Sequence, residues 1–298
     1  MTMRRSYKVS KNLIGCFMRS NLVTDDSEFL PTSHWEAELT LDFAPRGAKT
    51  ALVNRAHRGP LTVQRPFYPE GEVCHVYLLH PPGGVVAGDR LTINASAESS
   101  AKALITTPAA SKFYRSGGGE ARQTVNLTVA EGASLEWLPQ ETIVYEGALL
   151  NSAMHIDLAE HAHFIGWEIL ALGRPAASEG FDNGSANLNW RISRAGHLFY
   201  LERQHQDAQA FQARWGLAGH SACGTLFVYP ATSLQLAAVQ ELIGDEANRG
   251  VTLIEGLLIC RCLDRRADLL KSFFDAVWGL VRGDVVGKEV CAPRIWAT

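Results

Sequence analysis

Polar and apolar residues alternate along most of the chain between positions 35 and 230. The alternation is clearest in residues 91–96, 124–129 and 188–193, where every second side chain is apolar. A period of two is typical of a β-strand that buries one face and exposes the other to water. Such short runs, separated by turns that contain glycine and without long helical periods, predict a mainly β body over about residues 34–230.

Short polar turns interrupt the alternating runs at regular intervals. They lie at residues 97–98, 130–132, 159–160 and 195–196, and each joins one β-rich run to the next. Their spacing of roughly 30 residues is in the range of stacked repeat units. We therefore expect a β-helical or layered β architecture, with too little sequence identity between units for a regular solenoid.

Helical periods replace the alternation in the last quarter of the chain. An apolar stripe begins after Ser233 and ends at Gly244, which predicts a helix with Ser233 as its N-cap and Gly244 just past its end. Residues 252–263 are predicted to form an apolar strand, and a second helix with its own apolar stripe follows. That stripe consists of Leu270, Phe273, Phe274, Val277, Leu280 and Val281. This stripe can pack on the protein's own core or dock a partner. With two helices and a strand between them, residues 231–298 are expected to be an α+β part with two C-terminal helices.

Composition narrows the class of protein. The 298 residues are 46% hydrophobic, enough for a large core, and carry a formal net charge of -3. This charge gives no reason to expect nucleic acid or an anionic membrane as a partner, because both favour basic surfaces. No apolar run reaches the roughly 18–20 residues of a transmembrane helix. Six dispersed cysteines without a secretion signal predict reduced thiols, and hence a soluble, cytoplasmic protein.

The domain organisation is predicted to be simple. Residues 1–33 carry several basic side chains, have no acid before Asp25 and lack a clear hydrophobic signal segment. We expect them to be a disordered N-terminal extension, or the product of an upstream start codon, rather than a targeting peptide. Residues 34–298 are expected to form a single domain.

Glu168 occupies a position where a strand should be apolar. It shares one strand face with Phe164 and Leu170, and the opposite face of the same strand is also apolar. A strand with two apolar faces is normally buried. A buried ionised carboxylate costs several kcal/mol unless it has a partner, a proton or a cation.

Glu202 poses the same problem on another strand. Its place in the alternation puts it on the face of Leu198 and Tyr200. Arg174 and Arg203 are candidate partners for these two carboxylates in plain structural ion pairs. A functional role for the carboxylates is the alternative, since buried acids with shifted pKa values also gather at functional sites.

Other polar clusters give weaker signals. His155, His161 and His163 can supply metal ligands, since His161 and His163 share a strand face. They are the basis of an alternative interpretation, a metal-dependent hydrolase, although solvated polar residues are ordinary at a turn, and no stable metal site is predicted. Cys260 and Cys262 are better explained as buried free thiols. No motif of a catalytic site is present in the sequence.

Several motifs, taken together with their order and spacing, resemble one known family. They are GPLTVQRPFYP at residues 59–69, HPPGG at 80–84, GD at 88–89, TPAASKFYRS at 107–116, LEWLPQ at 135–140, LGRP at 172–175 and PRIW at 293–296. With these motifs the chain is similar to the UreD (UreH) family of urease accessory proteins over about residues 35–298. Residues 1–33 fall outside the resemblance.

The resemblance implies a β-helical body with two C-terminal helices and a non-catalytic scaffold that helps to load nickel into urease. Family members bind apo-urease and a UreF-type protein, which in turn engages a UreG-type GTPase that carries nickel. We therefore expect transient nickel(II) rather than a stably bound cofactor, and we expect the apolar stripe of the second helix to dock the UreF-type partner. The family also implies an internal polar tunnel, and its positions map here onto Asp89, Ser111, Lys112, Glu168, Arg174 and Glu202.

Overall fold

A computed structural model describes residues 35–297, so the expected extension over residues 1–33 lies outside the described residues. Strands dominate the described part of the chain, which confirms the prediction of a mainly β protein. Within it, no helix is both long enough and apolar enough to cross a membrane.

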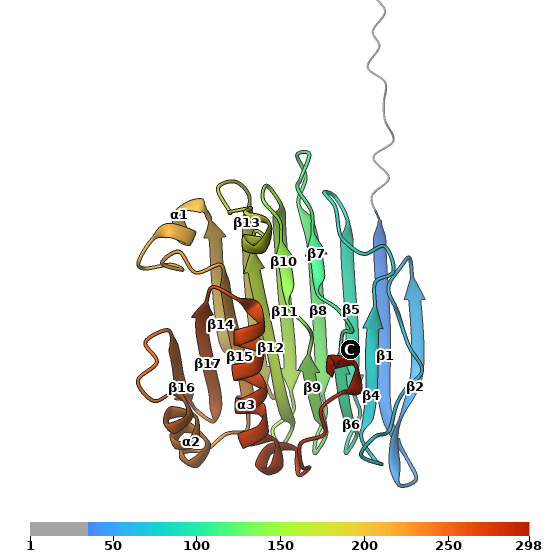
Figure 1. Ribbon diagram of the computed structural model, residues 1–298. Helices are drawn as coiled ribbons and strands as arrows, with labels where there is room; N and C mark the ends of the chain where they lie inside the picture. The colour runs from blue at the N-terminus through green and yellow to red at the C-terminus, as the bar shows by residue number, and fades with distance from the viewer. Residues whose placement is uncertain (1–34, 298) are drawn as a thin grey trace, which may run out of the picture. The chain divides into compact units, whose positions relative to one another are not determined.

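The first of two large sheets has seven strands in the order β14-β13-β11-β8-β5-β1-β2 (Figure 1). The strands from β1 through β5, β8 and β11 to β13 run parallel, whereas the edge strands β2 and β14 pair antiparallel. The members are β1 (Glu36–Arg46), β2 (Lys49–Arg58), β5 (Arg90–Ala97), β8 (Ala121–Val129), β11 (Leu149–Leu158), β13 (Ser185–Arg194) and β14 (His197–Asp207).

The second sheet follows the order β16-β17-β15-β12-β9-β6-β4-β3, and two short strands, β7 and β10, join it beside β12. Strands β4, β6, β9 and β12 are parallel, and β15, β17 and β16 continue the sheet antiparallel. The members are β3 (Thr62–Val63), β4 (Cys74–Leu79), β6 (Lys102–Thr106), β7 (Ser111–Phe113), β9 (Ser134–Leu138), β10 (Thr142–Val144), β12 (His163–Leu172), β15 (Ala222–Tyr229), β16 (Arg249–Ile254) and β17 (Leu257–Asp264).

Successive coils of the chain stack on one another, and each coil contributes one strand to the first sheet and one to the second. The pairs β5 and β6, β8 and β9, and β11 and β12 are three such coils. The predicted polar turns lie where coils stack: the amide of Ala130 donates to the carbonyl of Ala97 at 2.9 Å, and that of Ala159 to Val129 at 2.9 Å. The expected β-helical architecture, with a repeat of roughly 30 residues, is therefore confirmed.

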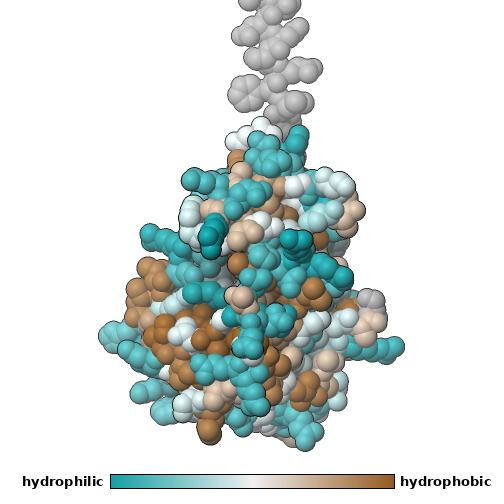
Figure 2. Space-filling view, turned by 60° about the vertical axis from the view of Figure 1, so that its left-hand side comes forward, coloured by the Kyte–Doolittle hydropathy of each residue, from teal (hydrophilic) through white to brown (hydrophobic). Residues whose placement is uncertain are grey.

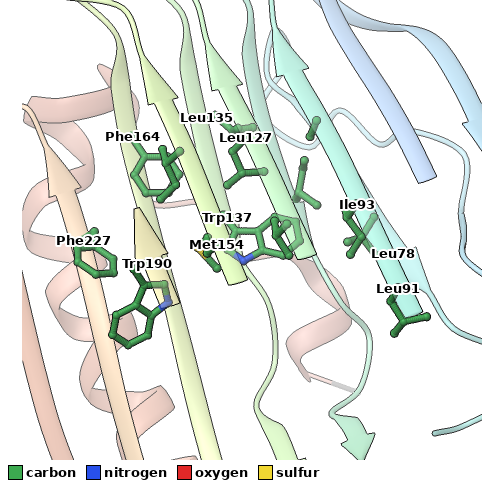
Figure 3. Close-up of a cluster of buried hydrophobic side chains, with 14 of the residues drawn as sticks. Leu78, Leu91, Ile93, Leu127, Leu135, Trp137, Met154, Phe164, Trp190 and Phe227 are labelled. Atoms are coloured by element: carbon green, nitrogen blue, oxygen red, sulfur yellow. The ribbon is translucent and has the colours of Figure 1, made fainter. Parts of the chain in front are cut away.

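Apolar side chains fill the space between the two sheets (Figure 3). They come from every second position of each strand, which is the alternation seen in the sequence. Trp190 of the first sheet, for example, packs edge-on against Phe227 of the second, with ring centroids 5.5 Å apart. Other buried members of this core in Figure 3 are Leu78, Leu91, Ile93, Leu127, Leu135, Trp137, Met154 and Phe164.

Helices occur mainly in the C-terminal part, as predicted. They are α1 (Ala208–Gln212), α2 (Ser233–Ile243) and α3 (Ala267–Val286), with 3-10 turns η1 (Pro175–Ala177) and η2 (Arg294–Ala297). Gly244 follows α2 as expected, but the N-cap is Thr232 rather than Ser233. The Thr232 hydroxyl accepts a hydrogen bond from the amide of Leu234 at 3.2 Å, which satisfies one of the free amides of the first turn.

The apolar run at residues 252–263 forms a hairpin rather than one strand. Strands β16 and β17 pair antiparallel across it. Glu255 and Gly256 both have positive φ angles, 47° and 88°, and together they reverse the chain. Glu255 and Gly256 interrupt an otherwise apolar run, so a turn signal was present in the sequence.

Helix α3 covers the outer face of the second sheet (Figure 1). Its apolar stripe packs on side chains such as Trp167 and Leu226 in a second core. Five of the six predicted docking residues are therefore buried, and only Leu280 is exposed. The docking role of this stripe stays a prediction, and Leu280 is the one member free to contact another protein. The buried members are Leu270, Phe273, Phe274, Val277 and Val281.

Candidate functional site

A cavity of about 760 Å³ opens at the end of the sandwich where β14 and β16 are the sheet edges. Its lining includes both of the carboxylates that the sequence marked as misplaced, Glu168 and Glu202. Glu168 comes from β12 of the second sheet and Glu202 from β14 of the first, so the two sheets contribute one carboxylate each. Figure 2 brings this end of the body forward. Exposed apolar residues gather in its lower part, where α2 and β16 lie, and include Leu234, Leu242 and Ile254.

Glu168 lies in the cavity wall without an ion pair to any residue between 35 and 297. Its Oε1 accepts a hydrogen bond from Ser152 Oγ at 3.1 Å, and its Oε2 accepts one from Trp190 Nε1 at 2.8 Å. Burial raises the pKa of Glu168, and the two hydrogen bonds oppose this effect without cancelling it. The plain ion pair that the sequence left open is therefore absent at this position among the described residues, and burial shifts the carboxyl toward its protonated form.

Glu202 does form an ion pair, but with a residue that sequence reasoning did not consider. Arg261 of β17 places Nη2 2.6 Å from Glu202 Oε2, whereas Arg203 is exposed on the same strand as Glu202. Burial raises the pKa of Glu202, yet hydrogen bonds from Gln204 and Tyr200 and the charge of Arg261 outweigh it. The pKa is left below its ordinary value, so Glu202 is ionised.

A bulge changes which neighbours share the face of Glu202. The pairing of β13 with β14 shifts between Ile192 and Ser193, so that Phe199 has no partner. Leu198 is therefore exposed and does not share the inward face, contrary to the prediction, while Tyr200 does.

The inward face of β14 is a row of polar side chains at alternating positions. Gln204 Nε2 donates to Glu202 Oε1 at 3.0 Å, and Gln206 Nε2 donates to Gln204 Oε1 at 3.3 Å. All three residues line the cavity. Gln206 is buried, and its Oε1 accepts no hydrogen bond. The row therefore ends in a buried oxygen that has no hydrogen-bond donor among residues 35–297.

The other four predicted tunnel residues do not line this cavity. Buried Asp89 accepts hydrogen bonds from the amides of Trp35 at 3.0 Å and Val86 at 3.1 Å, and so fixes the turn before β5. Ser111 and Lys112 lie on β7, which pairs with β10, and β10 pairs with the end of β12.

Arg174 follows β12 directly and is exposed. Its guanidinium forms an ion pair with Glu179 and lies 4.6 Å from the centroid of the Tyr145 ring. Arg174 is thus a partner of neither Glu168 nor Glu202. Of the six predicted positions, two line the cavity, three lie on or beside β7 and β10, and Asp89 lies in the turn before β5.

The three histidines of the alternative interpretation are not brought together around a metal position. His155 Nδ1 contacts Asn126 Oδ1 at 3.1 Å, and His161 forms a pair with Glu131. Burial lowers the pKa of His163, whose ring hydrogen-bonds to the backbone of Val285. Between residues 35 and 297, no group of three His, Cys, Asp or Glu side chains is placed to hold a metal ion. His155, His161 and His163 therefore do not form the shared metal site on which the hydrolase interpretation rested.

Two cysteines that the sequence marked, Cys260 and Cys262, match their prediction. Cys260 and Cys262 are buried free thiols, and burial raises the pKa of Cys260 to about 12. Such a thiol stays protonated and inert near neutral pH.

Sequence reasoning missed a second buried polar cluster under α3. Arg282 Nε lies 3.0 Å from Glu136 Oε1, and its Nη2 lies 2.7 Å from Glu70 Oε1. Trp278 Nε1 also donates to Glu136 Oε1, at 2.6 Å. Glu136 sits in an apolar strand run, LEWLP, so the signal that marked Glu168 was present here too.

Comparison with known proteins identifies relatives of this sequence. Residues 36–297 match the family model described as UreD urease accessory protein. A protein named urease accessory protein UreD from Dechloromonas aromatica (strain RCB) is 41% identical over 290 residues, covering 94% of this chain and 100% of the relative. Proteins of the same name are 43% identical over 270 residues in Citrobacter koseri, covering 90% of this chain and 93% of the relative. A protein of the same name in Trichormus variabilis is 40% identical over 273 residues, covering 90% of this chain and 98% of the relative.

Proposed function

Because this chain belongs to the UreD family of urease accessory proteins, we propose that it is a non-enzymatic scaffold through which nickel(II) passes to the urease apoprotein. Membership in the family supports a role in urease maturation. In our proposal the chain binds apo-urease and a UreF-type protein, and it meets a UreG-type GTPase through that partner. Its place of action is the cytoplasm, where ureases would be assembled.

The observation that carries the proposal is the cavity with one carboxylate from each sheet. Nickel(II) accepts oxygen and nitrogen ligands, and selectivity comes from geometry and ligand type rather than from affinity alone. Glu168 and Glu202 are oxygen donors on different strands, and they do not form a closed set of ligands with other His, Cys or acidic residues of the described chain. A conduit needs sites that are weak and spaced, because a closed site would retain the ion.

Glu168 suits a passing cation because it has no fixed counter-ion. Burial raises the pKa of this carboxyl, because an uncompensated charge is costly at a buried position. A divalent cation that enters can replace the proton and become the partner of the carboxylate. Asp89, Ser111, Lys112 and Arg174 are then proposed to line a continuation of the route beside β7 and β10.

Docking of the UreF-type partner is proposed on the outward side of α3. Most of the apolar stripe is buried, so contact falls to Leu280 and to exposed neighbours on the same helix such as Leu269. Exposed apolar side chains are ordinary on monomers and do not by themselves define an interface. The variant Leu280→Asp tests this part separately, by co-purification with the UreF-type protein.

The proposal is tested in a host that carries a urease operon from which its own UreD has been deleted. The wild-type chain is expected to restore urease activity and nickel in purified urease. Glu168→Ala and Glu202→Ala are expected to lower both by at least tenfold while still binding partners. Glu98→Ala, which removes an exposed carboxylate at the turn after β5, is the matched control.

Two results would count against the proposal at different levels. No restoration by a wild-type chain that is expressed and paired with a urease from a matching source would remove the maturation role. Full restoration by both carboxylate variants would move the nickel route elsewhere in the protein.

A further inference from the structure

Strand β14 is a free edge of the first sheet and forms one side of the cavity mouth (Figure 1). It pairs antiparallel with β13, in regular register from Tyr200 onward. Within the described part of the chain, residues 200–206 make no backbone hydrogen bond on their other side. Alternate amide and carbonyl groups of this stretch therefore face outward and can pair with another strand.

The three other terminal strands of the two sheets carry features that discourage pairing. Strand β3 has only two residues and β16 has six. Strand β2 is longer, but its cations include the exposed Lys49 and Arg58. Short strands and charged side chains are two ways in which proteins block an open sheet edge. On β14, in contrast, Leu201 is 51% exposed beside unpaired backbone.

Cations without a partner border this edge. Arg203 of β14, Arg191 of β13 and Arg214 in the loop after α1 are all exposed, and none of them forms an ion pair within residues 35–297. The edge is thus locally basic, although the chain has a formal net charge of -3. A second copy of the chain would bring the same cations to this edge, whereas an acidic strand would be attracted to it.

We propose that β14 is the docking edge for an extended, acidic segment of apo-urease, which adds to the first sheet as a further strand. The inference rests on the proposed function, because it assigns the surface that meets the recipient of nickel. Leu201 and Arg203 lie two positions apart on one face of β14. A matching segment places an apolar side chain opposite the first and an acidic one opposite the second. Backbone hydrogen bonds supply affinity, and these two side-chain pairs supply selectivity.

The position of β14 favours apo-urease over the UreF-type protein as the occupant. Strand β14 borders the cavity through which nickel is proposed to pass. Docking of the UreF-type protein is instead proposed on α3, which covers the second sheet. Unpaired arginines beside the mouth repel nickel(II). An acidic segment bound at β14 offsets this repulsion, so that the ion can leave once its recipient is docked.

Hydrogen exchange of the purified full-length chain, alone and with apo-urease from a matching source, tests whether the edge is covered. In the free chain, the outward amides of residues 200–206 should exchange freely, because they lack partners. In the complex, their exchange should slow at least tenfold, while that of β2 at the opposite edge stays unchanged. A complex that leaves residues 200–206 unprotected would overturn the inference.

Charge reversal at the edge tests the chemistry of the partner. Arg203→Glu is expected to raise the Kd for apo-urease at least tenfold, measured by biolayer interferometry. Arg55→Glu, at an exposed arginine of β2, makes the same charge change at the opposite edge and is the matched control. Circular dichroism and thermal unfolding confirm that both variants are folded. Equal effects of the two substitutions would show that only net charge matters, and would overturn the inference.

Two other outcomes separate this inference from the proposed function. If the wild-type chain forms no complex with apo-urease, the scaffold role itself fails, and the inference fails with it. If residues 200–206 become protected in the free chain as its concentration rises, the edge pairs with a second copy, and only the inference is overturned.

Discussion

Replacement of Arg282 by methionine is expected to destabilise the protein more than any surface substitution. The Arg282 side chain is 0% exposed, and its two partners, Glu136 and Glu70, are 1% and 10% exposed. Methionine fills a similar volume but leaves Glu136 without its cation and leaves Glu70 with His75, whose Nε2 lies 2.6 Å from Glu70 Oε1. Removing one partner of a buried ion pair typically costs about 3–5 kcal/mol, since the remaining charge is left without compensation.

The loss should appear in urea denaturation at pH 7 and in the melting temperature. For a domain of this size each kcal/mol shifts the Tm by about 2–4 °C, so a fall of roughly 5–20 °C is expected. Arg191→Met, on the exposed face of β13, should change stability by less than about 0.5 kcal/mol. The double variant Glu136→Gln with Arg282→Met should recover part of the loss, because it removes one stranded charge.

The stability difference between the wild type and Arg282→Met should also depend on pH. Burial raises the pKa of Glu70, but His75 and Arg282 outweigh it and leave the pKa below its ordinary value of 4.5. A lowered pKa contributes stability above the pKa of the unfolded chain, and this contribution disappears as pH falls through the folded value. The gap between wild type and Arg282→Met should therefore be widest near pH 7 and should narrow below pH 4.5. A loss under about 1 kcal/mol at pH 7 would refute the view that Arg282 compensates two buried charges.

Two further predictions concern the cavity and the backbone. Because burial raises the pKa of Glu168 above its ordinary value of 4.5, its contribution to stability is complete below that pH and is lost as pH rises through the folded value. Urea unfolding should thus show the wild type losing stability relative to Glu168→Gln as pH rises above 4.5, and a constant difference would contradict the assignment. Gly173→Ala places a Cβ 2.2 Å from the carbonyl oxygen of Gly180 at a φ of +69°, whereas Gly47→Ala has a similar φ of +64° and no atom within 4 Å. Gly47→Ala should cost about 1–2 kcal/mol and Gly173→Ala roughly 1–3 kcal/mol more, and equal losses would show that the contact at Gly180 relaxes freely.

Local patterns predicted the parts of the fold that depend on local chemistry. The alternation gave the strands of the coils, because each strand buries one face between the sheets. Gly244 predicted the end of α2, because glycine is favoured just past the last helical turn, where backbone carbonyls lack partners within the helix. Glu168 was found because an acid in a strand with two apolar faces is visible without any knowledge of the fold.

Contacts between residues that are far apart in the chain could not be predicted from the sequence. Arg261 meets Glu202 across 59 positions of sequence, and only the approach of β17 to β14 brings them together. The bulge at Phe199 moves Leu198 off the inward face, and no residue at this position predicts a bulge. Arg282 meets Glu70 across 212 positions for the same reason. The apolar stripe of α3 could be predicted from the sequence, but only the fold shows that most of it packs on the body of the protein.

The position of α3 at the end of the chain has a consequence for synthesis. Trp167 and Ile169 on the outer face of the second sheet are covered by a helix that begins at Ala267. At roughly 5–20 residues per second, the ribosome needs about 5–20 s to reach the helix after it has made β12. During that interval a broad apolar sheet is bare, so a chain released before the last 30 or so residues would present it to every neighbour in the cell. Yield of the protein in expression should therefore depend on translation of the final helix, and on chaperones that occupy its place until it arrives.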